Sequence, residues 1–590
     1  MSKFPSLQNV LNATQKTIFR FPLETITIIC GTIFAILLIE DEFKDSQEFL
    51  VKGVLSSSLC LVLFLSVSLF FFDSKKNNLF RFLTSMALGS LVVAFVFNFK
   101  KEITEVEIQQ FLVLNIALHL LVSFAGFLPK KYSQDEFWEF NKQLFLRILT
   151  SGLYSAVLYI GLALAITAVE NLFNVEITDK IYGYLFVIIA GIFNTIFFLN
   201  GVPDTNNNEN LLKLSYPNGL KNFTQYVLLP LISLYLVILI CYETKILVTL
   251  SLPVGWVSYL VLVFAIFGIL SFLLVHPIAA EKGNLWMRTF NRWFYYLMVP
   301  LLGLLFWAIL YRIHLYGFTH ERYYVLLLSI SLTIVVAYFL IQKQPKIIFI
   351  PISLCIAGLL SIVGPQSADS ISRNSQLSRF EIYMQKTEKV KLSFEQEKDL
   401  SSIVDFLEKN YGVETLLPYT KDKLTLLLKK DKTPESSEIM KALGFQYRYQ
   451  YDRNERNKND NEFYYNLYEN EQQRIENIHG YDIAFSIGKN ENLDCDKCIN
   501  INNKSYSIMS SKKEYGIELK INQDIIPLPI VDFVNENPAF DQNKNQKIVQ
   551  KIESPKYTVL MTYLTVNGKK EGMKKTLNQY RIKVMIRIKE

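Results

Sequence analysis

Residues 312–342 carry the sequence RIHLYGFTHERYYVLLLSISLTIVVAYFLIQ, in which a short polar segment precedes a long apolar one. From Tyr323 to Gln342 no side chain is charged. A helix rises about 1.5 Å per residue, so about 20 apolar residues cross a hydrocarbon core of roughly 30 Å. The segment therefore predicts a transmembrane helix, and the polar residues before it mark a boundary between membrane and water.

The same pattern recurs throughout residues 1–363 of the 590-residue chain. We expect a polytopic α-helical membrane protein with an extracytoplasmic α+β domain at its C-terminal end: a transmembrane domain over 1–363, a linker over 364–394 and a soluble domain over 395–590. Eleven spans are predicted, of which the seventh, with Pro230, and the eleventh, with Pro351, are the weakest. They are Phe21–Ile39, Phe49–Phe72, Leu79–Asn98, Ile108–Leu128, Leu144–Val169, Ile181–Asn200, Phe223–Cys241, Val257–Val275, Trp293–Ile313, Tyr323–Gln342 and Ile347–Val363.

The distribution of Lys and Arg predicts the orientation of these spans. Cytoplasmic loops are enriched in both residues, and alternate connections hold seventeen of them on one side and eight on the other. This places the N-terminus in the cytoplasm, and an odd number of spans then places the C-terminal third outside. The first apolar run has no small-residue cleavage site after it, so we expect it to be retained rather than removed as a signal peptide.

The soluble third has helix signals followed by strand signals. Apolar residues at helical spacing predict a helix over Asp399–Asn410 with Gly412 at its end. A second helix is predicted from Thr433 to Gly444. Beyond these, alternating or β-branched segments predict strands, of which the last two are expected to pair across a longer connection containing Gly568 and Gly572. The strands are Tyr481–Ile487, Ser505–Met509, Gly516–Ile521, Tyr557–Val566 and Tyr580–Ile588.

Cys495 and Cys498 form a CxxC motif in this third of the chain. Three interpretations compete. A zinc site needs four ligands and only His479 lies nearby; a thioredoxin-like pair needs a helix N-terminus; an oxidised turn between two strands suits an oxidising compartment. We expect the disulfide, and we expect no cofactor or metal.

Three polar segments fall on the outward face under this topology: CYETKILVTLSLPVGWVS (Cys241–Ser258), RIHLYGFTHERYY (Arg312–Tyr324) and GPQSADSISRNSQLSR (Gly364–Arg379). Pro253, Gly255 and Trp256 would break and anchor the first. In a functional interpretation these loops converge into a charged pocket or docking seam, framed by aromatic residues. In the alternative, Arg312 extends to the interface, Thr319 caps the tenth span, Glu321 lies in its first turn and the serines form a hydrated linker. The candidate site residues are Lys245, Arg312, Thr319, Glu321 and Arg322, with Tyr316, Tyr323, Tyr324 and Trp256 around them.

Several function classes lack support in the sequence. The net charge of +7 is not arranged as a basic stripe with interleaved aromatics, which argues against nucleic-acid binding. No Walker motif, GxSxG, HExxH or glycine-rich phosphate loop is present. The expected partners are the lipid bilayer and another protein of the cell envelope.

The succession FWEFNKQLFLR, YETKI, LPVGWVS, YGFTHERYY and GPQSADSISRNSQLSR, followed by SIVDFLEKNYGVETLLPY and KALGF, resembles the bacterial domain-of-unknown-function 4153 family of polytopic membrane proteins. The resemblance covers most of the chain from about Phe137. It implies a bacterial inner-membrane protein, and it supplies no reaction, cofactor or catalytic residue.

Three functions are therefore compared. The first is a non-enzymatic envelope protein that docks, senses or organises another component through its periplasmic domain. The second is a permease or exporter, for which the proline-interrupted spans would form a discontinuous site, although few charges lie at the membrane midplane. The third is a transferase acting on a lipid-linked substrate, with Glu321 as acid or base and Arg312 and Arg322 as a phosphate clamp.

Overall fold

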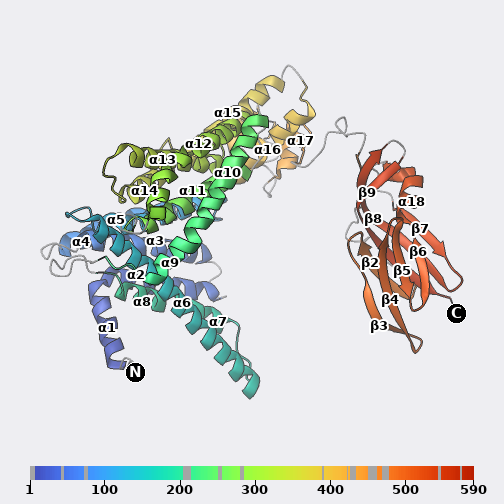
Figure 1. The fold of residues 1–590 in the computed structure, drawn as a ribbon, viewed down its shortest axis with the longest axis horizontal. Helices are drawn as coiled ribbons and strands as arrows, with labels where there is room; N and C mark the ends of the chain where they lie inside the picture. The colour runs from blue at the N-terminus through green and yellow to red at the C-terminus, as the bar shows by residue number, and fades with distance from the viewer. Residues whose placement is uncertain are drawn as a thin grey trace. The chain divides into compact units, whose positions relative to one another are not determined.

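A computed structural model of the chain contains two compact units, Met1–Arg448 and Tyr449–Glu590, and each is described by itself (Figure 1). The structure describes residues 7–40, 46–71, 78–203, 214–249, 256–278, 285–387, 391–420, 423–424, 434–449, 462–467, 478–541, 547–571 and 574–589.

The first unit is helical. Its elements are α1 (Leu7–Arg20), α2 (Pro22–Ile39), α3 (Gln47–Phe71), α4 (Asn78–Phe97), α5 (Glu105–Ala125), α6 (Gln134–Phe173), α7 (Lys180–Ile188), the π-turn η2 (Ile189–Phe193), α8 (Asn194–Asn200), α9 (Asn218–Phe223), the π-turn η3 (Thr224–Leu228), α10 (Leu229–Thr249), α11 (Trp256–Val275), α12 (Leu285–Tyr316), α13 (His320–Ile341), α14 (Phe349–Ile362), α15 (Ala368–Thr387), α16 (Phe394–Tyr411), the 3-10 helix η4 (Val413–Tyr419) and α17 (Ser436–Leu443).

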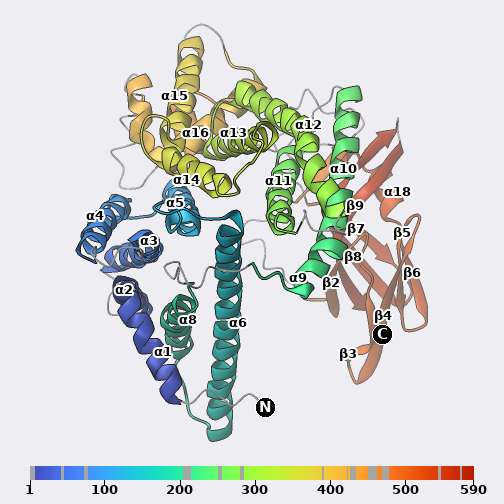
Figure 2. The ribbon, with the colours of Figure 1, turned by 60° about the vertical axis from the view of Figure 1, so that its left-hand side comes forward.

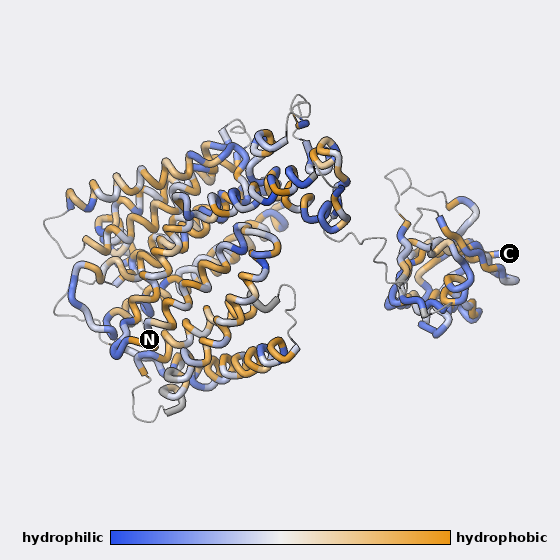
Figure 3. Tube along the Cα trace, turned by 90° about the horizontal axis from the view of Figure 1, so that it is seen from above, coloured by the Kyte–Doolittle hydropathy of each residue, from blue (hydrophilic) through white to orange (hydrophobic). Residues whose placement is uncertain are grey.

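Long apolar helices dominate this unit, and Figure 3 shows them hydrophobic over most of their length. Within the described residues, nine are long and apolar enough to cross a membrane, which indicates a multi-pass membrane protein. The predicted eighth span corresponds to α11, whose side chains are described from Leu260 onward, and the predicted eleventh corresponds to the shorter apolar helix Phe349–Ile362. The count of eleven spans therefore stays a prediction.

Small residues allow the N-terminal helices to approach one another. An added Cβ at Gly53 of α3 would lie 2.7 Å from the Phe34 ring of α2, and one at Gly89 of α4 would lie 2.8 Å from the Phe64 ring of α3. Helices in lipid gain little from hydrophobic association, so such close contacts supply much of their packing energy. The α14 helix continues the group by packing on α5, as Figure 2 shows.

The predicted seventh span is irregular where its proline lies. Pro230 has no backbone N–H to donate to the carbonyl four residues earlier, and the preceding turn η3 is a π-helix rather than an α-helix. Pro351, in the predicted eleventh span, lies in the first turn of α14, where no intrahelical donor is needed. Both prolines are thus accommodated within helices.

The expected linker over 364–394 is mostly helical in the structure. The α15 helix occupies Ala368–Thr387, and its Phe380 belongs to one buried core with Leu400 and Leu407 of α16 and Met440 of α17. These apolar faces bury one another, which explains why α16 and α17 belong to the first unit rather than to the C-terminal one. The two compact units therefore meet between residues 448 and 449, not at the expected residue 395. That the chain leaves the membrane before residue 395 stays a prediction.

The expected helices of the C-terminal third are present with shifted ends. The α16 helix begins earlier than predicted because Ser393 and Gln396 form a capping box, and it ends at Gly412 as expected. The α17 helix has Glu435 at its N-cap position, without a side-chain capping hydrogen bond, and ends at Gly444 in the left-handed conformation. Thr433, the expected N-cap, lies outside the described residues.

The second unit consists of two antiparallel sheets. Its elements are β1 (Glu462–Asn466), β2 (Ile483–Gly488), β3 (Asp494–Ile501), β4 (Lys504–Lys513), β5 (Gly516–Ile521), β6 (Asp524–Leu528), α18 (Ile530–Glu536), the 3-10 helix η7 (Pro538–Asp541), β7 (Val549–Glu553), β8 (Tyr557–Glu571) and β9 (Lys574–Ile588). One sheet has the order β1-β8-β9-β2 with β7 also on β8, and the other has the order β3-β4-β5-β6.

Both sheets contribute to a single core. It contains Tyr563 and Val584 from the first sheet, Leu519 and Leu528 from the second, and Val534 from α18. The expected α+β domain is accordingly a sheet domain with two short helical segments, since α16 and α17 pack elsewhere.

All five predicted strands are present, and the pairing of the last two is confirmed, but their connection was predicted wrongly. β8 continues through Gly568 to Glu571, which pairs with Lys574 at the start of β9. The ladder shifts register at a bulge next to Gly568 and then continues, so the connection is short rather than long. Gly572 lies outside the described residues.

Candidate functional site

The turn between α12 and α13 requires glycine at position 317. Gly317 has a φ of +69°, a region that other residues rarely adopt, and its N–H donates to the Ile313 carbonyl at 2.8 Å. An added Cβ would also lie 2.8 Å from Arg379 and 2.9 Å from Ser375 of α15. The turn is therefore shaped to fit against α15.

Side chains of α15 satisfy the backbone of this turn. The Gln376 amide, which is buried, donates to the carbonyls of Tyr316 at 3.0 Å and Phe318 at 2.7 Å. The Phe318 N–H donates to the Ser375 hydroxyl at 2.9 Å. Helix ends leave carbonyls without intrahelical partners, and here a segment about 60 residues away supplies them.

Arg322 stabilises the same turn from the α13 side. Its Nη1 donates to the carbonyls of Tyr316 at 3.1 Å and Gly317 at 3.0 Å, and its guanidinium lies 5.4 Å from the centre of the Tyr316 ring. Next to it, the Tyr323 hydroxyl donates to the Gln366 carbonyl at 2.7 Å, before α15 begins. Two of the three predicted polar segments therefore meet.

His320 joins α13 to α15 and α16. Its ring is 5% exposed and stacks on Phe406, with the ring centres 5.4 Å apart. His320 Nε2 lies 3.1 Å from the Tyr411 hydroxyl and 3.6 Å from Asp369 Oδ1. The Arg373 guanidinium lies over the Tyr411 ring at 5.5 Å. We call His320, Asp369 and Tyr411 the histidine cluster.

Electrostatics of the histidine cluster favour a charged carboxylate and a neutral phenol. A hydrogen bond to His320 lowers the pKa of the Asp369 carboxyl, although burial opposes this, and Tyr411 acts in the same direction as His320. Burial raises the pKa of Tyr411, and the Asp369 carboxylate raises it further. The cluster therefore links three helices through a partly buried polar contact.

A second set of polar contacts fixes α16. Arg379 of α15 forms an ion pair with Asp399 at 2.6 Å, and the Tyr383 hydroxyl donates to the same carboxylate at 2.7 Å. At the other end, Lys409 pairs with Glu105 of α5 at 2.6 Å, where both side chains are exposed. Arg379 and Tyr383 thus hold α16 on α15, and Lys409 joins α16 to the apolar helix α5.

The predicted site residues have different positions in the structure. Thr319 is the N-cap of α13, but its side chain makes no capping hydrogen bond. Glu321 is exposed in the first turn of the same helix. Arg322 is close enough to Arg312 and Glu321 for their charges to act on its guanidinium. Lys245 lies on α10, exposed to the surroundings of that helix. Within the described residues no hydrogen bond or ion pair connects Lys245 to the turn.

Part of the first polar segment lies outside the described residues. Pro253 and Gly255 lie outside the described residues, and so does the side chain of Trp256. The five-residue pocket accordingly stays a prediction, of which the structure brings Arg312, Thr319, Glu321 and Arg322 to one turn.

Sequence reasoning did not select the residues with the most contacts at this site. His320, Asp369, Gln376 and Tyr411 all lie in the motifs quoted above, but their side chains meet only in the folded chain. The available signal was the recurrence of polar residues at helical spacing, namely Asp369, Arg373 and Gln376 on one face of α15.

The arrangement suits attachment better than catalysis. The histidine ring is buried, and the polar atoms around it bond to one another. Among the described residues, no three His, Cys, Asp or Glu side chains are grouped closely enough to hold a metal ion.

The fold and this contact define a class of protein, namely a multi-pass helical membrane protein with a polar helical layer on its apolar helices and a separate sheet domain. The sequence model of the family described as Domain of unknown function (DUF4153) matches residues 59–393, which is more than half of the chain. The chain belongs to this family. The match includes His320, Asp369 and Gln376, whereas Tyr411 follows it.

One curated relative is similar over a shorter region. The uncharacterized protein PM1469 of Pasteurella multocida (strain Pm70) is 26% identical over 244 residues, which cover 40% of this chain and 40% of the relative. No solved structure matches the chain.

Proposed function

We propose that the chain is an inner-membrane protein of bacteria that docks or senses another envelope component through extracytoplasmic elements. These elements are the helical layer α15–α17 and the sheet unit. The excess of Lys and Arg in alternate connections supports this orientation, with the N-terminus in the cytoplasm. The disulfide between Cys495 and Cys498 also supports it, because disulfides persist in oxidising compartments.

The observation that carries the proposal is the attachment of α15 to the α12–α13 turn. Gln376, Ser375 and Arg322 bond to backbone groups of residues 316–318 in that turn, and the histidine cluster adds a partly buried contact to α16. A layer held by several partly buried hydrogen bonds keeps a defined orientation on the membrane helices. A layer with a defined orientation suits a protein that presents a binding surface to a partner, or one that passes a signal from that surface to the membrane helices.

Photo-crosslinking in living cells tests the proposal. A photoreactive residue replaces Ile382, which is 62% exposed on α15, or Tyr464, which is 50% exposed on β1. A control replaces Ile33, which is exposed on the apolar helix α2. We expect the first two sites to capture one envelope protein reproducibly and the control to capture lipid. Capture of lipid alone from all three sites would contradict the proposal.

A transport function is the second candidate. Two of the apolar helices contain π-turns, η2 and η3, and such irregularities are common at functional sites. Purified protein in liposomes would then move a solute across the bilayer, whereas a docking protein would not. A lipid-linked transferase stays a third hypothesis, since Glu321, Arg312 and Arg322 share one turn.

A further inference from the structure

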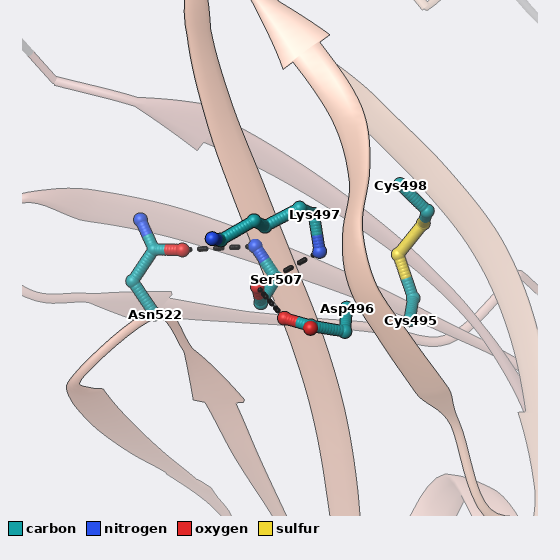
Figure 4. Close-up of a disulfide and its surroundings, with 6 residues drawn as sticks. All are labelled: Cys495, Asp496, Lys497, Cys498, Ser507 and Asn522. Carbon is teal, nitrogen blue, oxygen red and sulfur yellow. Dashed lines mark hydrogen bonds between the residues drawn. A yellow bond between two sulfur atoms is a disulfide. The ribbon is translucent and has the colours of Figure 1, made fainter.

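The two cysteines lie within one strand, at a bulge. In the ladder between β3 and β4, Cys495 pairs with Ile508 and Ile499 pairs with Tyr506, so Asp496, Lys497 and Cys498 lie opposite Ser507 alone. The disulfide was expected in a turn between strands, but both sulfurs belong to β3 (Figure 4). The bulged segment forms a small ring closed by the sulfur–sulfur bond.

Ser507 satisfies the backbone of this bulge without help from the disulfide. Its hydroxyl donates to Asp496 Oδ1 at 2.7 Å and accepts from the Lys497 N–H at 2.9 Å, as Figure 4 shows. The Ser507 N–H in turn donates to Asn522 Oδ1 at 2.8 Å. The ladder pairs on both sides of the bulge therefore keep β3 on β4 when the sulfur–sulfur bond opens, while the bulge itself can change conformation.

The disulfide contributes little as a crosslink. Only three positions separate the two cysteines, and it connects no second strand or helix. Loop-entropy stabilisation increases with the length of the closed loop, so this bond constrains the unfolded chain very little. A purely structural role does not explain its position.

The ring also holds an unfavourable backbone conformation. Lys497, between the cysteines, has a φ of +49°, in the left-handed region that residues other than glycine rarely occupy. Opening the ring allows this residue to relax, which favours the reduced form.

One sulfur is more accessible than the other. Cys498 is exposed, whereas Cys495 is half-buried and packs against the core of the sheet unit. Among the described strands, β3 is the edge of its sheet, so no neighbouring strand covers its outer side. A reductant can therefore approach Cys498 without unfolding the domain.

We propose that Cys495 and Cys498 form a thiol–disulfide exchange site that accepts two electrons from a dithiol reductase of the thioredoxin class. A thiolate of the reductase attacks the Cys498 sulfur, the bond to Cys495 breaks, and Cys495 leaves as a thiolate that takes a proton. The second reductase thiol then attacks the mixed disulfide and releases Cys498 as a thiol, while the reductase becomes the disulfide. The site lies on a strand and lacks the helix N-terminus that activates catalytic CxxC motifs, so it is the substrate of exchange and not its catalyst.

The test uses the purified full-length chain with thioredoxin, NADPH and thioredoxin reductase. We expect reduction of the folded protein about tenfold faster than by glutathione at equal thiol concentration, since the second thiol of thioredoxin resolves the mixed disulfide intramolecularly. A thioredoxin whose second cysteine is replaced by serine should become trapped on Cys498, as peptide mass spectrometry would detect. Reduction only after denaturation, or trapping on Cys495, would overturn the proposal.

Two variants separate backbone strain from charge. Lys497→Gly removes the penalty of the left-handed conformation and should slow reduction severalfold, whereas Lys497→Ala removes the charge but keeps the penalty and should behave like the unmodified chain. Equal rates for both variants would remove the strain argument. Deuterium uptake after reduction should rise in residues 494–501 and stay constant in β5.

The exchange reaction does not depend on where the sheet unit lies. Only the expectation that the cysteines are oxidised in cells rests on the proposed extracytoplasmic location. Alkylation of thiols in intact cells, with and without prior reduction, reports that state. If the cysteines are reduced in cells but exchange normally when purified and oxidised, the proposed location is wrong and the exchange site stands.

Discussion

The α12–α13 turn with α15 and the β8–β9 pair both join segments of the chain, but they do so by different means. At the turn, individual side chains bond to backbone carbonyls, Gln376 from a distant segment and Arg322 from the start of the following helix. In β8–β9, the backbone ladder makes the connection and a fully buried core fills the space beside it. Residue identity should therefore matter most at the turn, and residue volume most in the sheet unit.

The largest effect is expected in the sheet unit. Tyr563→Ala removes a fully buried ring that stacks on Phe533 at 5.3 Å, and it should lower the free energy of unfolding of this unit by about 3–5 kcal/mol. Pulse proteolysis in urea on the full-length chain measures this. Tyr464→Ala, at a half-exposed tyrosine of β1, is the control and should cost far less.

The next effect concerns the shape of the turn. Gly317→Ala forces a side chain into a φ of +69° and against Ser375 and Arg379, so it should weaken the attachment of α15 by about 1–3 kcal/mol. Faster hydrogen–deuterium exchange of the α15 backbone amides would show the weaker attachment. Gly303→Ala is the matched control, because an added Cβ there meets nothing within 4 Å. Similar exchange in both variants would show that the turn is not specifically shaped.

Removing a single polar group should have a somewhat smaller effect. Gln376→Ala leaves the carbonyls of Tyr316 and Phe318 without this donor and should cost about 1–2 kcal/mol, again measured by exchange in α15. Gln385→Ala, on the same helix at an exposed hydrogen bond to Glu381, serves as the control. Equal amide exchange in Gln376→Ala and Gln385→Ala would contradict the expectation that residue identity matters most at the turn.

The histidine cluster should make the attachment dependent on pH at both extremes. Because the pKa of Asp369 is lowered in the folded chain, its stabilisation is present above the ordinary value of about 3.9 and is lost as pH falls below it. Because the pKa of Tyr411 is raised, its contribution is lost as pH rises above about 10. Thermal unfolding across pH measures both changes. Asp369→Asn should flatten the acidic limb and, because the carboxylate also raises the pKa of Tyr411, weaken the alkaline limb. An unchanged acidic limb would contradict the role of Asp369.

The smallest effect is expected at the exposed ion pair. Lys409→Ala removes the contact with Glu105, yet both side chains are more than 60% exposed, so the loss should be no more than about 1 kcal/mol and should shrink further in high salt. A larger loss would mean that the contact with α5 contributes more to the attachment of α16 than the histidine cluster does.

The sequence predicts the apolar helices well because bilayer thickness imposes their length. Their ends depend on local chemistry that hydropathy does not reveal. The α6 helix, for instance, begins ten residues before the predicted Leu144, since the Ser133 side chain accepts from the Glu136 N–H and starts it early. Similarly, alternation predicted β8 and β9, whereas their full length depends on a bulge near Gly568.

The candidate site was predicted only in part because its contacts join distant segments. Arg322 and Thr319 lie in one polar stretch and were visible there, but His320 meets Tyr411 across 91 residues. Without the fold, each of these residues looks like an ordinary helix-end or surface residue. Likewise, the CxxC spacing indicated a disulfide but could not show that it lies within a strand.

The length of α6 has a consequence for the bilayer itself. Its 40 residues rise about 60 Å, roughly twice the thickness of the hydrocarbon core. The first turns are occupied by polar contacts, including the bond from Trp138 Nε1 to the Leu273 carbonyl at 2.7 Å, but about 30 residues follow them. Of these, the 22 residues between Arg147 and Glu170 carry no charge and rise about 33 Å, which matches the hydrocarbon core. The bilayer therefore needs little tilt or thickening to hold α6, and the first turns of the helix, with Trp138, should extend beyond the hydrocarbon core.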